Sequence, residues 1–244
     1  MVIDILTLFP GMFRGVFEES MLKIAQARGI VQINTRDIRD WTSDRHRTAD
    51  DKPYGGGPGM VMKIEPIDRA LADLRKQDVQ LGEASLVVLL TPQGEKFHQD
   101  LARKLSKHEH IIMISGHYEG FDERIRSLVD MEISIGDYIL TCGEIPAMAV
   151  CDAVVRLNPG VLGAQECLKD ESFEMGVLEY PQYTRPFEYN GMKVPEVLVS
   201  GDPKKINKWQ GEKALERTAF RRPDLLMENP RSSGGCKTEK QIYK

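Results

Sequence analysis

The chain has 244 residues, of which 41% are apolar and 29% charged, and its formal net charge is −4. No apolar run approaches the ~18 residues that a membrane span requires, and the first residues lack a basic leader, so we expect a cytoplasmic protein without membrane anchor or signal peptide. The four cysteines show no C-x-x-C spacing, which argues against a disulfide framework or structural zinc.

The charge is unevenly distributed along the chain. Residues 201–244 hold 11 Lys/Arg against 6 Asp/Glu, so this segment carries +5 and the first 200 residues carry −9. Opposed charge between segments indicates a polyanionic partner that contacts one part of the molecule. A solvated helical face explains the same pattern equally well.

The first part of the chain predicts strands and helices in alternation. Residues 2–9 form a short apolar run typical of a buried strand, and residues 13–24 repeat apolar side chains every three or four positions, as in one helix that Gly29 ends. Extended structure returns at residues 30–34. Apolar residues at helical spacing then predict a helix at residues 67–74.

The middle of the chain continues this alternation. Residues 85–90 (SLVVLL) and 110–115 (HIIMIS) predict buried strands, with a helix around residues 101–105 between them. A short central strand at residues 132–135 precedes a last helix, which stops at residues 159–160 (Pro-Gly). Strands separated by helices predict the α/β class, with a mainly parallel sheet covered on both faces.

After this last helix the sequence becomes polar and charged and loses its apolar periodicity. We expect a domain of residues 1–160, a polar linker of residues 161–185 and a small helical C-terminal domain of residues 186–244. Asp202 is suited to cap a basic helix whose first residue is Pro203. The tail beyond residue 228 is expected to be loose.

A cluster of glycines stands out at residues 54–60 (YGGGPGM). It satisfies G-x-G-x-G, a pattern of nucleotide-binding turns, but such turns follow a hydrophobic strand, and residues 45–54 are almost wholly polar. Two interpretations remain open. The glycines could simply form tight turns, or they could leave the backbone uncovered so that a large ligand approaches it closely.

Glycine-containing segments also follow three predicted strands. They are residues 91–94 (TPQG), 116–120 (GHYEG) and 134–144 (SIGDYILTCGE). Because the carboxyl ends of parallel strands share one edge of a sheet, these segments predict a pocket lined by free peptide groups. They contain no Lys or Arg, so phosphate is disfavoured, while Glu119, Asp137 and Glu144 favour a ligand with positive charge. Ordinary tight connections would explain one such segment more easily than three.

Five motifs in a fixed order extend over most of the chain. They are PYGGGPGM, GHYEGFDER, SIGDYILTCGE-PA, DAVVR-x-x-PGVLG and YPQYTRP. Together they resemble the bacterial tRNA (guanine-N1)-methyltransferase family, the TrmD type of the SPOUT superfamily. The resemblance implies a deep trefoil knot in the α/β domain and S-adenosyl-L-methionine held by the knot loops. The matching cofactor-binding residues are Leu89, Leu90, Thr91, Pro92, Gln93, Gly94, Gly116, Tyr118, Glu119, Gly120, Ser134, Ile135, Gly136, Asp137, Tyr138, Ile139, Leu140, Cys142, Gly143 and Pro146.

The reaction that the resemblance implies is methyl transfer to N1 of guanosine 37, next to the anticodon, in tRNAs with a guanosine at 36. N1 carries a proton, so transfer needs a general base, and negative charge gathers on O6. Arg156 matches the catalytic arginine. The position of the catalytic aspartate falls on Glu171, with Asp170 before it, and either carboxylate could serve. Other departures from the family pattern are Cys142, His117 and Cys167.

The resemblance also implies partners. These are the tRNA anticodon stem-loop and a second copy of the chain, with the active site at the interface of a homodimer. Residues matching the RNA-facing motifs are Asp50, Gly55, Gly56, Gly59, Tyr183, Arg185 and Pro186. The sequence predicts no metal centre, although the family suggests an indirect Mg²⁺ role near Glu119. Rival hypotheses are methylation of another RNA target by a SPOUT relative and a non-catalytic RNA-binding protein.

Overall fold

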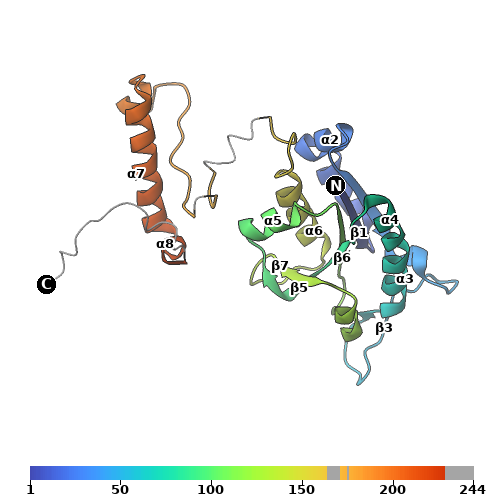
Figure 1. The fold of residues 1–244 in the computed structure, drawn as a ribbon. Helices are drawn as coiled ribbons and strands as arrows, with labels where there is room; N and C mark the ends of the chain where they lie inside the picture. Colours follow the sequence, from blue (N-terminus) through green and yellow to red (C-terminus); the bar gives the residue numbers. More distant parts are fainter. Residues whose placement is uncertain (164–170, 175, 229–244) are drawn as a thin grey trace. The chain divides into compact units, whose positions relative to one another are not determined.

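The computed structural model describes residues 1–163, 171–174 and 176–228. The chain divides into two compact units, Met1–Gly163 and Ala164–Lys244, and each is described by itself (Figure 1). The expected loose tail lies outside the described residues. None of the described helices is long and apolar enough to cross a membrane.

A five-stranded parallel sheet forms the centre of the first unit. Its strands are β1 (Val2–Thr7), β2 (Gln32–Asp37), β5 (Leu86–Lys96), β6 (His110–Ser115) and β7 (Met131–Ser134). They lie in the order β2-β1-β6-β5-β7, and every pair is parallel, which confirms the predicted α/β class. The prediction that β7 is central is wrong: the fully buried β6 takes a central place, and β7 pairs with β5 at the edge.

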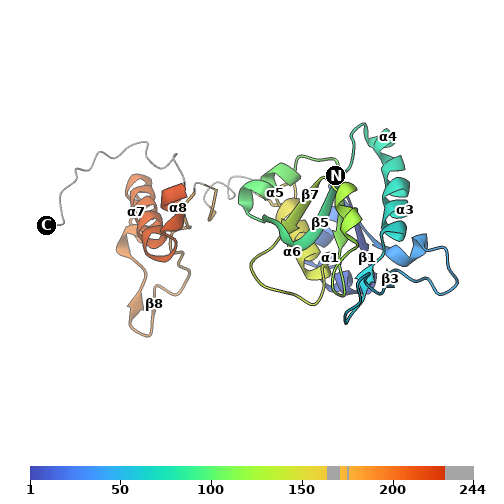
Figure 2. The same cartoon turned by 90° about the horizontal axis from the view of Figure 1, so that it is seen from below.

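Helices cover both faces of the sheet, as Figures 1 and 2 show. One face packs against α1 (Arg14–Phe17), α2 (Ser20–Ala27), α5 (Gln99–Leu105) and α6 (Glu144–Val155). The other packs against α3 (Ile64–Leu74) and the 3₁₀ helices η2 (Ile38–Trp41) and η4 (Glu123–Ser127). Shorter elements are η1 (Pro10–Phe13), η3 (Arg75–Gln77), α4 (Asp78–Leu81) and the β3–β4 pair (Asp50–Asp51 and Val61–Met62). Successive residues of β6 alternate between the two cores, as the period of a strand requires.

The predicted single helix at residues 13–24 is wrong. The segment contains η1, α1 and α2, and the chain is extended at Glu19 before α2 begins. This break resets the helical phase, so that Leu22 and Ala25 are buried while Ile24 is 39% exposed. The burial of two side chains against the sheet therefore overrides the continuous periodicity of the sequence.

Strand β5 is longer than predicted. The sequence predicts a strand at residues 85–90 and a loop at residues 91–94, but β5 continues to Lys96 through a register shift against β7 between Leu90 and Glu95. Gly94 lies so close to β7 that an added Cβ would be 2.4 Å from the Glu132 carbonyl carbon. A bulge of this kind re-aims side chains without ending the strand.

A buried ionic cluster joins β1, β6 and α4. His110 lies between Asp4 (Nε2 to Oδ2, 3.1 Å) and Asp78 (Nδ1 to Oδ1, 2.8 Å), and Arg36 donates to Asp4 at 2.9 Å. Burial alone would lower the pKa of His110, but its bonds to the two carboxylates outweigh burial and raise it. Burial would raise the pKa of Asp4, but hydrogen bonds from His110 and Arg36 lower it. The pKa of Asp78 is likewise lowered against burial, by Ser85 and His110.

The second unit is built on α7 (Pro203–Arg221), with α8 (Asp224–Glu228), η6 (Glu196–Val199) and a β8–β9 pair (Glu188–Tyr189 and Met192–Lys193). The side chain of Asp202 accepts from the N–H groups of Lys204 (3.0 Å) and Lys205 (3.3 Å), which confirms the predicted cap. Thr218 is fully buried, and its hydroxyl accepts from the N–H of Leu178 at 2.8 Å. Residues around 178 therefore dock on α7.

Candidate active site

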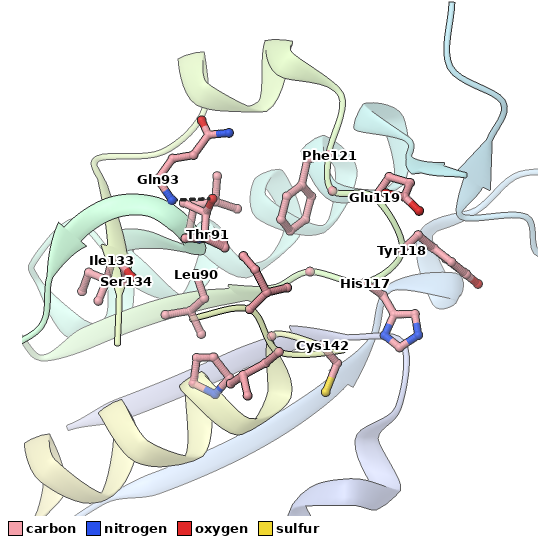
Figure 3. A pocket seen from close by; sticks show the side chains of 18 of the residues that line it. Leu90, Thr91, Gln93, His117, Tyr118, Glu119, Phe121, Ile133, Ser134 and Cys142 are labelled. Carbon is pink, nitrogen blue, oxygen red and sulfur yellow. Dashed lines mark hydrogen bonds between the residues drawn. The ribbon is translucent and has the colours of Figure 1, made fainter. Parts of the chain in front are cut away.

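A cavity of about 430 Å³ opens at the carboxyl ends of β5, β6 and β7 (Figure 3). Its walls come from the bulged part of β5, from the segment between β6 and η4, and from the segment between β7 and the first turn of α6. The volume lies in the range of small-molecule sites, and the edge of the sheet is where ligands bind in parallel α/β proteins.

The residues predicted to bind the cofactor line this cavity, with Gly94 and Asp137 as exceptions. Gly94 is required by its close approach to β7, as described above. The carboxylate of Asp137 pairs with the Lys96 ammonium at 2.7 Å, on an exposed edge. The three predicted segments therefore do meet at one cavity.

Two of these segments are locked together at Gly143. Its N–H donates to the Gly116 carbonyl oxygen at 2.7 Å. A Cβ at position 143 would lie 2.5 Å from the Gly116 nitrogen and 2.9 Å from the Cα of Ser115. Only glycine fits at this contact, which holds the segment after β7 against the end of β6.

The glycine cluster reaches the cavity at one point. Gly59 has φ +88°, and an added Cβ would lie 2.4 Å from the Cγ of Glu119, a cavity residue. The N–H of Glu119 donates to the Met60 carbonyl oxygen at 3.1 Å. The glycines at 55–57 also have positive φ, as tight turns require, whereas Gly59 is the glycine that Glu119 approaches closely. Both interpretations of the cluster therefore apply, each to different glycines.

The charge around the cavity differs from the prediction in two ways. The three predicted segments contain no Lys or Arg, but Arg126 of η4, outside these segments, adds a basic side chain to the wall. Glu144 does not face a ligand as expected: it is fully buried and accepts from the Thr7 hydroxyl at 2.6 Å. Glu119 forms no ion pair with any residue that the structure describes, so it leaves a negative charge at the cavity.

Several residues of the wall were not among the individual residues predicted to bind the cofactor, although His117 and Thr141 lie in the predicted segments. They are His117, Phe121, Asp122, Glu123, Ile125, Arg126, Ile133 and Thr141. Four of them, His117, Phe121, Asp122 and Glu123, belong to the unbroken GHYEGFDER motif, which runs from the end of β6 into η4. The His117 ring lies 4.9 Å from the rings of both Phe9 and Tyr118, and the Cys142 thiol is 9% exposed (Figure 3).

Of the predicted catalytic residues, Arg156 is not among those that line the cavity of its own chain. Arg156 ends α6, and its N–H donates to the Asp152 carbonyl oxygen at 3.1 Å. Pro146, in the first turn of α6, lines the cavity. Ten residues of helix separate the two, or about 15 Å along the axis. Glu171 belongs to the second unit, and Asp170 and Cys167 lie outside the described residues.

The residues predicted to face RNA fall in both units. Asp50 lies in β3 and Gly55, Gly56 and Gly59 lie in the following loop, all in the first unit. In the second unit, Tyr183, Arg185 and Pro186 are exposed, and the Tyr183 ring lies 6.4 Å from that of Trp209 on α7. No group of three metal-ligating side chains occurs among the residues described.

This arrangement defines a class of protein: an α/β protein with a cavity of small-molecule size at the carboxyl edge of its parallel sheet, beside the carboxylate of Glu119. Comparison with known proteins makes the assignment specific. The family model described as tRNA (Guanine-1)-methyltransferase TrmD matches residues 1–228, and the chain belongs to this family. The expected resemblance, and with it the expectation of a tRNA methyltransferase enzyme, is confirmed.

Individual relatives agree with the family. A tRNA (guanine-N(1)-)-methyltransferase of Carboxydothermus hydrogenoformans is 58% identical over 227 residues, 93% of this chain and 87% of the relative. Proteins of the same name from Dictyoglomus turgidum and Staphylococcus carnosus are 55% and 54% identical, over 92% and 94% of this chain and 89% and 92% of theirs. The similarity therefore covers both units.

Proposed function

We propose that the protein transfers a methyl group from S-adenosyl-L-methionine to N1 of guanosine 37, next to the anticodon, in tRNAs with a guanosine at 36. The observation that carries this proposal is the cavity at the sheet edge, which is lined by the three segments whose motifs match the family. Family membership supplies the reaction class, and the cavity supplies a place for the methyl donor.

The cavity residues fit this methyl donor. Glycines at 116, 120, 136 and 143 line the cavity without side chains, so the adenosine part of the donor can approach the main chain closely there. The Glu119 carboxylate suits the ammonium or sulfonium charge of the donor. When bound, S-adenosyl-L-methionine supplies an electrophilic methyl group, so the chain itself must activate the acceptor.

The acceptor chemistry requires a base and a positive charge. We assign the guanidinium of Arg156 to the developing charge on guanine O6 and a carboxylate to the N1 proton. Glu171 is preferred as the base, with Asp170 as the alternative. Glutamate keeps the chemistry of aspartate but is longer by one methylene, so the surrounding segment must adjust its position.

A homodimer would bring these groups to the cavity. The helix α6 separates Arg156 from the cavity of its own chain by about 15 Å, more than the length of an arginine side chain. In a homodimer, a second copy of the chain could instead place its Arg156 at this cavity. As further parts of this proposal, the α/β domain contains a deep trefoil knot, and residues 161–185 link it to a helical C-terminal domain. The protein is also proposed to act in the cytoplasm.

The proposed tRNA contacts use both units. The basic helix α7 suits phosphates of the anticodon stem, and binding should weaken with added salt. The guanine must leave its stack to expose N1, as in other enzymes that act on a base edge. Because the described residues near Glu119 offer no set of carboxylates for a resident Mg²⁺ ion, we derive no step through a metal.

A single-turnover assay tests the proposed function. The purified protein is mixed with methyl-labelled S-adenosyl-L-methionine and a tRNA that carries guanosines at 36 and 37. Label in N1-methylguanosine at position 37 supports the proposal. Label elsewhere would favour another RNA target, and binding of both ligands without transfer would favour a non-catalytic protein.

Three variants test the assigned roles in the same assay. Arg156→Ala should abolish transfer and leave cofactor binding intact. Comparison of Glu171→Gln with Asp170→Asn identifies the base, which should be the carboxylate whose loss stops transfer. Full activity in both would show that the base lies elsewhere.

A further inference from the structure

Arg126 is the basic side chain at the cavity that the sequence did not predict, and its surroundings suggest a role. We propose that Arg126 is a positioning residue, which fixes the Gln93 amide and the bulge of β5 as one wall of the cofactor cavity. This proposal rests on the proposed function, because it assumes that the methyl donor binds in this cavity.

The guanidinium of Arg126 contacts three segments of the cavity wall. Its Nη2 donates to the Gln93 Oε1 at 2.5 Å, and its Nε lies 2.7 Å from the Glu123 carboxylate of η4. Its Nη1 donates to the Glu132 carboxylate of β7. The planar fork of arginine can hold three acceptors at once in fixed directions, which a lysine ammonium on a flexible stem does less well.

The bulge of β5 is the part of the wall that these side-chain contacts stabilise. Between Leu90 and Glu95 the register against β7 shifts, so the regular ladder does not fix the peptide groups of residues 91–94. Within this stretch the Gln93 N–H reaches the Thr91 hydroxyl at 3.4 Å, which is a long hydrogen bond (Figure 3). A charge-assisted bond from Arg126 to the side chain of Gln93 is stronger and ties the bulge to η4 and β7.

The same contacts make Arg126 a poor ligand for an RNA phosphate. The carboxylates of Glu123 and Glu132 both pair with it, and the side chain is only 28% exposed. A phosphate would have to displace these partners. Arg126 therefore acts on the wall of the cavity rather than on a polyanion.

The bond also fixes the orientation of the Gln93 amide. Because a guanidinium only donates, Oε1 of Gln93 must face Arg126, and the two N–H groups are left to other acceptors. Gln93 lies at the rim of the cavity, across from Glu119 (Figure 3). An oriented amide donor opposite a carboxylate would bind the acceptor atoms of the donor molecule, such as ring nitrogens or its carboxylate.

A double-mutant cycle on the full-length protein tests this role. The affinity for S-adenosyl-L-methionine is measured by calorimetry for the wild type, Arg126→Gln, Gln93→Ala and the double variant. Arg126→Gln should weaken binding about tenfold, or about 1.4 kcal/mol. Because Arg126 acts through Gln93, the same change should cost less than twofold in the Gln93→Ala background. The KM for tRNA should stay unchanged.

The matched control is Arg75→Gln. Arg75 donates to the Leu128 carbonyl at 3.3 Å, just after η4, but does not line the cavity, so its loss should leave cofactor affinity unchanged. Arg126→Lys keeps the charge without the fork and should bind as weakly as Arg126→Gln; it serves as the test variant if the glutamine variant unfolds.

The outcomes separate this inference from the proposed function. A wild-type protein that does not bind S-adenosyl-L-methionine overturns the proposed function. Normal wild-type binding with affinities within twofold in folded Arg126 variants overturns the positioning role alone. Fully additive effects in the cycle also overturn it, because Arg126 would then act independently of Gln93.

Discussion

Replacing Gly143 by alanine tests the contact that joins two walls of the cavity. The backbone of Gly143 has φ −83° and ψ −7°, which alanine adopts without strain. Any effect of the substitution must therefore come from the space that the new methyl group needs. Its nearest neighbours are main-chain atoms of Gly116 and Ser115, at 2.5 and 2.9 Å, and these cannot rotate away as a side chain would.

The size of the effect follows from this distance. Non-bonded carbon atoms prefer about 3.5–4.0 Å, so the two segments must separate by roughly 1 Å. Overpacking of this kind destabilises a fold by about 1–3 kcal/mol. A displacement of about 1 Å between reacting groups can reduce a rate about 100-fold. Single-turnover methyl transfer and thermal unfolding of Gly143→Ala measure the two effects.

Gly15→Ala is the matched control for this experiment. Gly15 lies in α1, and an added Cβ there meets no atom within 4 Å, so the same chemical change should leave the transfer rate near wild type and should not lower the melting temperature. If Gly143→Ala transfers methyl groups at the wild-type rate with an unchanged melting temperature, the close contact between the two segments is not what holds the cavity.

Three further predictions concern stability. The ionic cluster of His110, Asp4 and Asp78 contributes its full stability between about pH 4 and 6.5. This contribution is lost as the pH rises through the raised pKa of His110. It is also lost as the pH falls through the lowered pKa values of Asp4 and Asp78. When the pH is raised from 5.5 to 9, the free energy of unfolding in urea should therefore fall less for His110→Gln than for the wild type. An equal fall in both proteins would contradict this stabilising role of His110. Thr218→Val leaves the Leu178 N–H without its acceptor and should cost about 1–3 kcal/mol in thermal unfolding, while Thr218→Ser should be nearly neutral. Asp202→Ala removes the cap of α7 and should cost about 1 kcal/mol of unfolding free energy by circular dichroism, which Asp202→Asn should restore.

The fold class followed from the sequence because parallel strands require crossovers, and buried runs in alternation with helical periodicity leave few other solutions. The errors arose where partners far along the chain decide the local structure. The helix break before Ser20 depends on burying Leu22 and Ala25 against the sheet. The extension of β5 beyond Leu90 depends on its pairing with β7, which local residue preferences do not report.

The location of the cavity also followed from the sequence, since glycines after three strands of one sheet must meet at one edge. The identity of its charged groups did not follow. Glu144 lies beside the cavity residue Gly143 in the chain, but the first turn of α6 directs it to Thr7 instead. Arg126 enters the wall through a short 3₁₀ helix, which hydrophobic periodicity does not predict.

The glycines in the cavity wall have a consequence for inhibitors. A compound that competes for this cavity by bonding to the main chain relies on atoms that every codon encodes alike. Substitutions at Gly116 or Gly143 would crowd the contact on which the enzyme itself depends. Resistance to such a compound should therefore arise through altered expression or uptake more readily than through point mutations in the cavity.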